Sequence, residues 1–112
     1  MMITNDITWN NVSDGGTGLV GGLMNISFPD LMSRVEALGA TNVGCPDGHY
    51  ENYFRYVGTF KGAVFTLYDA YGIHIGGGND LDVDGLIVAL TALVGGEKGY
   101  PTPAYQIAQM LG

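Results

Sequence analysis

One run of alternating apolar and polar residues and two runs of aromatic and β-branched residues predict strands in this 112-residue chain. Residues 17–28 alternate in this way and predict one strand. We expect its apolar face to comprise Val20, Met24, Ile26 and Phe28. Gly21 and Gly22 in the middle of this run predict a bulge or a close crossing by another element.

Aromatic and β-branched residues predict two further strands, over residues 50–60 and 62–71. Lys61-Gly62 lies between them and predicts a tight hairpin turn. Residues 73–75 either continue the second of these strands or form another short one. Residues 3–12 read as a short strand or as an arm.

Two stretches carry the helical apolar period instead. The first is residues 27–39, with Ser27 as N-cap, Asp30 completing a capping box and Gly39 as the stop. Its apolar face is predicted to hold Leu31, Met32, Val35 and Leu38.

The second helix is predicted over residues 81–94 and ends at Gly95-Gly96. We expect Asn79 or Asp80 to cap it. Its apolar stripe comprises Val83, Leu86, Ile87, Leu90, Leu93 and Val94. A short helix is predicted over residues 104–112.

This order of elements predicts an α+β fold, a small antiparallel sheet of four or five strands with two main helices packed on one face. The length predicts a single domain over residues 1–112. Residues 1–16 are interpreted as an N-terminal arm, and residues 97–112 as a C-terminal arm that contains the short helix.

The net charge of the chain limits the kinds of partner that we expect it to bind. The net charge is −7, from eleven acids and only four bases, Arg34, Arg55, Lys61 and Lys98. These bases are scattered, so we expect neither sequence-specific nucleic-acid binding nor tracking along a phosphate backbone. Charged residues make up only 13 % of the chain, which suggests that another subunit covers part of the surface. We therefore expect a homo-oligomer.

A single cysteine, Cys45, excludes a disulfide within the chain. The sequence starts without a signal-peptide pattern, and no apolar run is long enough to span a membrane. We expect a cytoplasmic protein that does not enter membranes.

The stretch from Gly76 to Asp84 could serve an anion or a cation. The glycine run 76–78 lacks the spacing and the lysine of a phosphate loop, and the expected role is a turn from strand to helix. Asp80, Asp82 and Asp84 match the start of a calcium loop, but its twelfth position is Thr91 instead of glutamate. We expect no bound metal and no cofactor.

His74 is the main candidate for acid–base chemistry, with Asp69 and Cys45 as its candidate partners in a small hydrolase. Cys45 precedes a proline and lacks the basic neighbours that would activate a thiol. A structural histidine and an inert cysteine form the alternative, and we assign no catalytic residue.

Aromatic residues cluster between positions 50 and 71, and strand alternation places some of them on the outer sheet face. Exposed tyrosines suit an interface or a stacking platform for a base, and an arginine among them suits a phosphate or carboxylate. The candidate ligand-binding residues are Arg55, Tyr56, Lys61, Tyr68 and His74.

Several short motifs resemble an uncharacterised family of small tailed-phage accessory proteins with a YD…HIGG motif. The matching pieces are Leu38-Gly39, PDG at 46–48, Lys61-Gly62, TLYD at 66–69 and IHIGG at 73–77. Two family lysines are replaced here by His49-Tyr50 and Ala70-Tyr71, and Ile73 stands where the family has a tryptophan. The resemblance implies a phage accessory protein, which would act in the host-cell cytoplasm, and implies no particular chemistry.

These observations favour a non-enzymatic phage-type counter-defence protein that sequesters a nucleotide-like immune signal at an oligomer interface. Direct inhibition of a host defence protein through the acidic surface is the first alternative. A small hydrolase using His74 and Asp69 is another, and a structural virion protein is the last.

Overall fold

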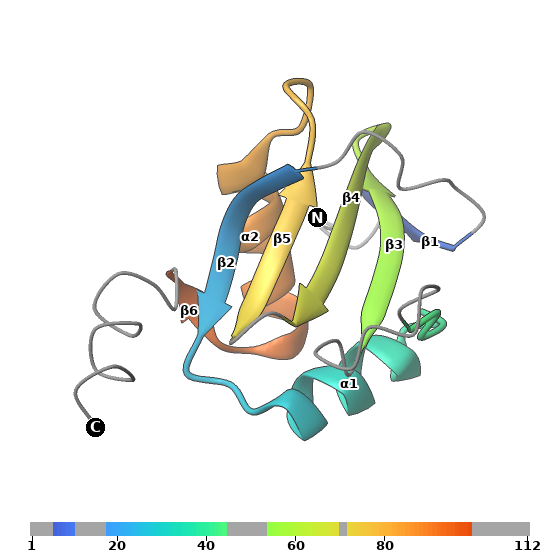
Figure 1. Ribbon diagram of the computed structural model, residues 1–112, viewed down its shortest axis with the longest axis vertical. Coiled ribbons are helices and arrows are strands. Elements are labelled where there is room, and N and C mark those ends of the chain that lie inside the picture. The colour runs from blue at the N-terminus through green and yellow to red at the C-terminus, as the bar shows by residue number, and fades with distance from the viewer. Residues whose placement is uncertain (1–5, 11–17, 45–53, 70–71, 100–112) are drawn as a thin grey trace.

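Six antiparallel strands and two helices make up the part of the chain that the computed structural model describes, residues 6–10, 18–44, 54–69 and 72–99. The strands lie in the order β1-β3-β4-β5-β2-β6 (Figure 1). The elements are β1 Ile7–Trp9, β2 Gly18–Met24, α1 Phe28–Ala37, β3 Arg55–Phe60, β4 Ala63–Asp69, β5 Ile73–Gly77, α2 Val83–Val94 and β6 Glu97–Lys98. The predicted α+β class is therefore confirmed, with more strands than expected.

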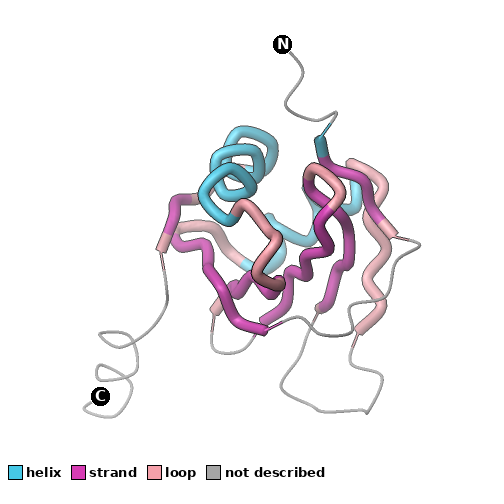
Figure 2. The backbone as a smooth tube through the Cα atoms, turned by 90° about the horizontal axis from the view of Figure 1, so that it is seen from above, coloured by secondary structure: helices cyan, strands magenta, loops and turns pink. Residues whose placement is uncertain are grey.

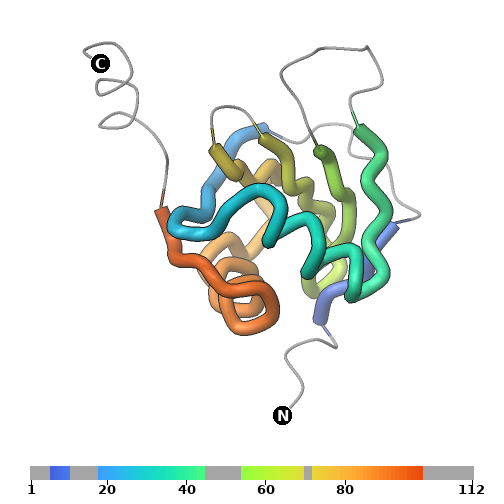
Figure 3. Tube along the Cα trace, turned by 90° about the horizontal axis from the view of Figure 1, so that it is seen from below, coloured from blue at the N-terminus to red at the C-terminus, as the bar shows by residue number. Residues whose placement is uncertain are grey.

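The sheet curls, and both helices lie on its concave side (Figure 2). We call this side the inner face of the sheet and the opposite side its outer face. Leu31 and Val35 of α1 join Leu86 and Leu90 of α2 in one hydrophobic core with inward-facing strand residues. From below, the two helices lie next to each other (Figure 3), and the Arg34 guanidinium donates to the Val94 carbonyl oxygen at 2.6 Å. This bond occupies a carbonyl at the end of α2 that no helical N–H can reach.

The hairpin between β3 and β4 turns at Lys61-Gly62, as predicted. Both residues have positive φ, 52° and 87°, and Phe60 pairs with Ala63 across the turn. Two consecutive positive φ values match the twist of the flanking strands. Residues 73–75 belong to the separate strand β5, which runs antiparallel to β4.

Strand β2 contains the predicted irregularity, because its pairing with β5 shifts between Leu19 and Gly21. The bulge changes which residues face inward, so the expected apolar face is confirmed only in part: Val20, Ile26 and Phe28 pack against the core, but Met24 does not. Leu23, at 2 % exposure, points into the core, whereas Met24 is 41 % exposed. Gly21 lies under α2, where an added Cβ would be 3.1 Å from Val83 Cγ1.

Helix α1 follows the sequence prediction at its start. The Asp30 N–H donates to Ser27 Oγ at 3.2 Å, which confirms Ser27 as the N-cap. The helix ends at Ala37, and Gly39 has a φ of 107°. Leu38 was expected on the apolar face but is the C-cap residue and is 39 % exposed.

The N-cap of helix α2 lies two or three residues later than predicted. Asp82 is the N-cap and accepts a bond from the Gly85 N–H at 3.0 Å, so the assignment to Asn79 or Asp80 was wrong. Gly76 and Gly77 also differ from expectation, because they extend β5 instead of forming the turn. A turn was predicted for these residues only because they are glycines. Their pairing with β2 and β4 holds them in an extended conformation instead.

The two edge strands account for the larger sheet. Part of the expected N-terminal arm is β1, which pairs with β3, and the expected C-terminal arm starts with β6, which pairs with β2. Strand β1 lies within residues 3–12, which were read as a short strand or as an arm. Strand β6 has only two residues, too few to show an alternating pattern, so periodicity could not predict it. The helix expected over 104–112 lies outside the described residues.

Candidate functional site

Three of the five candidate ligand-binding residues form a row across the outer face of the sheet. Arg55 of β3 is paired with Tyr68 of β4, and Tyr68 is paired with His74 of β5. Their neighbours along each strand, such as Tyr56, Leu67 and Ile75, point into the core. We call Arg55, Tyr68 and His74 the outer row; it follows the adjacent strands β3, β4 and β5 of Figure 1.

Tyr68 and His74 are in direct ring contact within the outer row. Their ring centroids are 5.6 Å apart and the planes are nearly perpendicular, at 86°. Burial raises the pKa of the Tyr68 phenol, and the positive charge of Arg55 opposes this increase. Tyr68 is therefore neutral at physiological pH and can donate a hydrogen bond.

His74 is the most enclosed member of the outer row, at 6 % exposure. Burial lowers the pKa of its imidazole, and the nearby Asp69 charge acts in the opposite direction. Its Nε2 atom is buried and has no hydrogen-bond partner within the described part of the chain. An unsatisfied buried polar atom costs about 1–3 kcal/mol, so His74 is not optimised for stability.

The other two candidates lie elsewhere. Tyr56 is fully buried on the inner face, and its hydroxyl donates to Glu36 Oε2 at 2.6 Å. Lys61 lies in the hairpin turn, with its Nζ 3.8 Å from Asp82 Oδ2. Strand alternation and the length of β3 separate these two residues from the outer row.

The proposed partners for acid–base catalysis are not assembled around His74. Asp69 follows Tyr68 on β4 and therefore points to the inner face, where its Oδ1 accepts a bond from the Phe54 N–H at 3.0 Å. Asp69 is 1 % exposed and occupied by this backbone bond. Cys45, the other proposed partner, lies outside the described residues.

Two of the three aspartates that resemble a calcium loop, Asp82 and Asp84, have other partners. Asp82 caps α2, and Asp84 Oδ1 lies 3.0 Å from Lys98 Nζ. No group of three or more His, Cys, Asp or Glu side chains that could hold a metal ion occurs among the residues with described positions. The carboxylates of Asp82 and Asp84 thus cap α2 and pair with Lys61 and Lys98.

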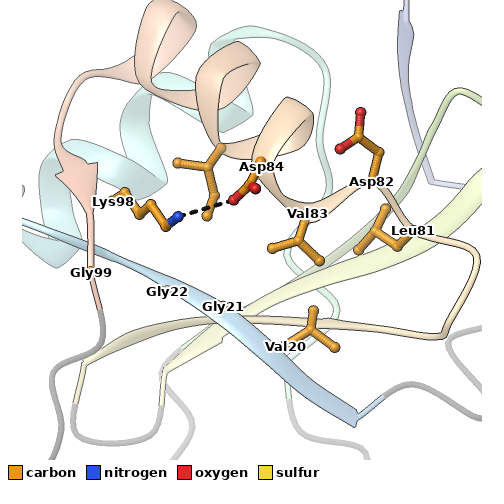
Figure 4. Close-up of a pocket in the computed structure, with 10 residues that line it drawn as sticks. Val20, Gly21, Gly22, Leu81, Asp82, Val83, Asp84, Lys98 and Gly99 are labelled. Carbon is orange, nitrogen blue, oxygen red and sulfur yellow. Dashed lines mark hydrogen bonds and ion pairs between the residues drawn. The ribbon is translucent and has the colours of Figure 1, made fainter.

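A pocket of about 470 Å³ lies between α2, β2 and β6 (Figure 4). We call it the α2 pocket. Apolar side chains and glycine backbone form most of its lining, and charged residues stand at its rim: Val20, Gly21, Gly22, Leu81, Asp82, Val83, Asp84, Ile87, Lys98 and Gly99. Sequence reasoning did not identify this pocket, because Lys98 reaches it only through the two-residue strand β6.

Comparisons with known proteins add no assignment: no family model, no curated protein and no solved structure matches this chain. Among the helices of the described residues, none is long and apolar enough to cross a membrane.

Proposed function

We propose that this chain is a non-enzymatic, phage-type accessory protein that sequesters a small nucleotide-like signal at the outer row, in the cytoplasm of the host cell. The observation that supports this proposal is the register that joins Arg55, Tyr68 and His74, which are separated in sequence, into one row. A cation, an aromatic ring and an imidazole in one row match the phosphate and the base of such a ligand.

Each residue of the outer row has a separate role in this proposal. Arg55 and Tyr68 are partly exposed and meet the ligand, Arg55 at a phosphate and Tyr68 at the base. His74 is almost fully buried, so it acts through its ring contact with Tyr68 and holds the phenol in place. Tyr56 is not part of this site, because it is bound to Glu36 in the core.

The same sheet face supports self-association. Leu19 and Met24 of β2 are 51 % and 41 % exposed, and both lie on the outer side of the sheet. Burial of these two side chains against another subunit would remove apolar surface from water, which stabilises association. We place the ligand at such an interface, where two copies would enclose it.

Direct inhibition of a host defence protein is the second candidate. The net charge of −7 favours it, because an acidic surface can meet a basic one. Hydrolysis by His74 and Asp69 has less support, because strand alternation directs these side chains to opposite faces and Asp69 bonds to Phe54.

A thermal-shift screen with cyclic dinucleotides and ADP-ribose-type compounds tests the proposal. We expect a higher Tm with at least one nucleotide, and intact ligand after heat release from the purified protein. Arg55→Met should weaken binding about tenfold, because a charge-assisted hydrogen bond to phosphate is lost. Lys61→Met is the matched control and should bind as the parent does.

Three outcomes would contradict the proposal. Recovery of a converted ligand would indicate an enzyme. Equal weakening by Lys61→Met and Arg55→Met would indicate a nonspecific charge effect. A single host protein captured with no nucleotide response would favour the direct inhibitor.

A further inference from the structure

The α2 pocket is separate from the outer row and lies on the other side of the sheet. Its volume of about 470 Å³ is within the range of small-ligand sites, about 300–1,000 Å³. A ligand bound in the α2 pocket would be independent of the proposed nucleotide site, because the α2 pocket and the outer row share no side chain.

The interior of the α2 pocket suits an apolar group. Leu81, Val83 and Ile87 line it from the α2 side, and Gly21 and Gly22 line it from β2 without side chains. Substitution at Gly21 would narrow this space, since a Cβ there would lie 3.1 Å from Val83 Cγ1. An apolar ligand chain would replace water in this space favourably.

The rim of the α2 pocket carries one opposite-charge pair directly beside this apolar space. Asp84 Oδ1 of α2 and Lys98 Nζ of β6 are 3.0 Å apart, and their side chains are 81 % and 67 % exposed (Figure 4). Such exposed pairs are weak, about 0–1 kcal/mol, so a ligand can contact both partners. Asp82 points away from this pair, capping Gly85 and facing Lys61.

We propose that the α2 pocket binds a free apolar α-amino acid. A ligand with one charge would satisfy one member of the Asp84–Lys98 pair and be repelled by the other. An α-amino acid carries its ammonium and its carboxylate on one carbon, so it matches both members at their short spacing. Its ammonium meets Asp84, its carboxylate meets Lys98, and its side chain enters the apolar space beside Val83 and Ile87.

Calorimetric titration of the full chain with L-leucine and L-phenylalanine tests this assignment. The matched probes are N-acetyl-L-phenylalanine, which lacks the ammonium, and L-phenylalanine amide, which lacks the carboxylate. We expect at least one free amino acid to bind and both matched probes to bind about tenfold more weakly or not at all. No binding of either amino acid at millimolar concentration overturns the proposal.

Variants locate the binding site. Lys98→Met and Asp84→Asn should each weaken binding about tenfold, and neither threatens folding because both side chains are exposed. Val83→Trp should abolish binding by filling the space, whereas Lys61→Met, outside the pocket, should leave it unchanged. If Lys98→Met and Asp84→Asn bind the amino acid with the affinity of the parent, the assignment to the α2 pocket is overturned. Loss of binding in Lys61→Met alone would also overturn it.

Discussion

The two faces of the sheet both bury polar side chains, but they differ in how these groups are satisfied. On the inner face, Tyr56 donates to Glu36 and Asp69 accepts from the Phe54 N–H. On the outer face, His74 is nearly as buried, yet its Nε2 has no partner among the described residues. The inner face is therefore arranged for stability, whereas the outer face retains unused hydrogen-bonding capacity.

The largest expected effect is the loss of an inner-face aromatic ring. Phe65 is fully buried and packs edge-on against Trp9, with ring centroids 5.5 Å apart. Phe65→Ala should lower the free energy of unfolding by about 3–5 kcal/mol, because the cavity it leaves cannot collapse fully. Urea denaturation measures this change. Val64→Ala changes the adjacent, outward-facing position and should lower the free energy of unfolding by less than about 1.5 kcal/mol. Equal losses of stability in the two variants would contradict the proposed difference between the two faces.

A smaller loss is expected from one inner-face hydrogen bond. Tyr56→Phe removes the hydroxyl that donates to Glu36 Oε2 at 2.6 Å and keeps the ring in the core. We expect destabilisation of about 0.5–1.5 kcal/mol, the usual net value of such a bond. Denaturation of Tyr56→Phe, Glu36→Ala and the double variant gives the coupling between the two side chains. Strict additivity would show that the bond contributes nothing.

On the outer face, removal of a buried polar side chain should cost little stability or increase it. His74→Leu removes a buried imidazole whose Nε2 is unsatisfied, and leucine fills similar space. The free energy of unfolding should stay within about 1 kcal/mol of the parent, or rise, because Nε2 bonds to no residue of the described chain. A loss of more than about 2 kcal/mol in the same denaturation assay would mean that Nε2 has a strong partner.

The smallest effect is expected in the pH dependence of stability. Burial lowers the pKa of His74 below its ordinary 6.5, against the opposing charge of Asp69. The unfolded chain therefore binds the proton more readily, and the His74 contribution to stability is complete above pH 6.5 and decreases as the pH falls towards the lowered folded value. Tm measured across this range should fall more steeply for the parent than for His74→Leu. Parallel curves would show that His74 has the same pKa in both states.

The sequence by itself determined most of the regular elements and the cap, turn and bulge that depend on single residues. The Ser27 cap, the Lys61-Gly62 turn and the bulge near Gly21 all follow from backbone preferences of single residues, which act over a few positions. Strand alternation likewise predicted that some of the aromatic residues between positions 50 and 71 lie on the outer sheet face, since adjacent side chains point to opposite faces. These features depend on neighbours in sequence, and therefore sequence reasoning could reach them.

Only the tertiary structure decided which of these positions meet. The register of β3, β4 and β5 joined Arg55 to Tyr68 and His74 and left Tyr56 in the core. The two-residue strand β6 brought Lys98 to Asp84 across the α2 pocket, although no periodic signal marked it. Pairing between distant segments depends on the hydrogen bonds and packing of the whole sheet, so local sequence patterns do not determine it.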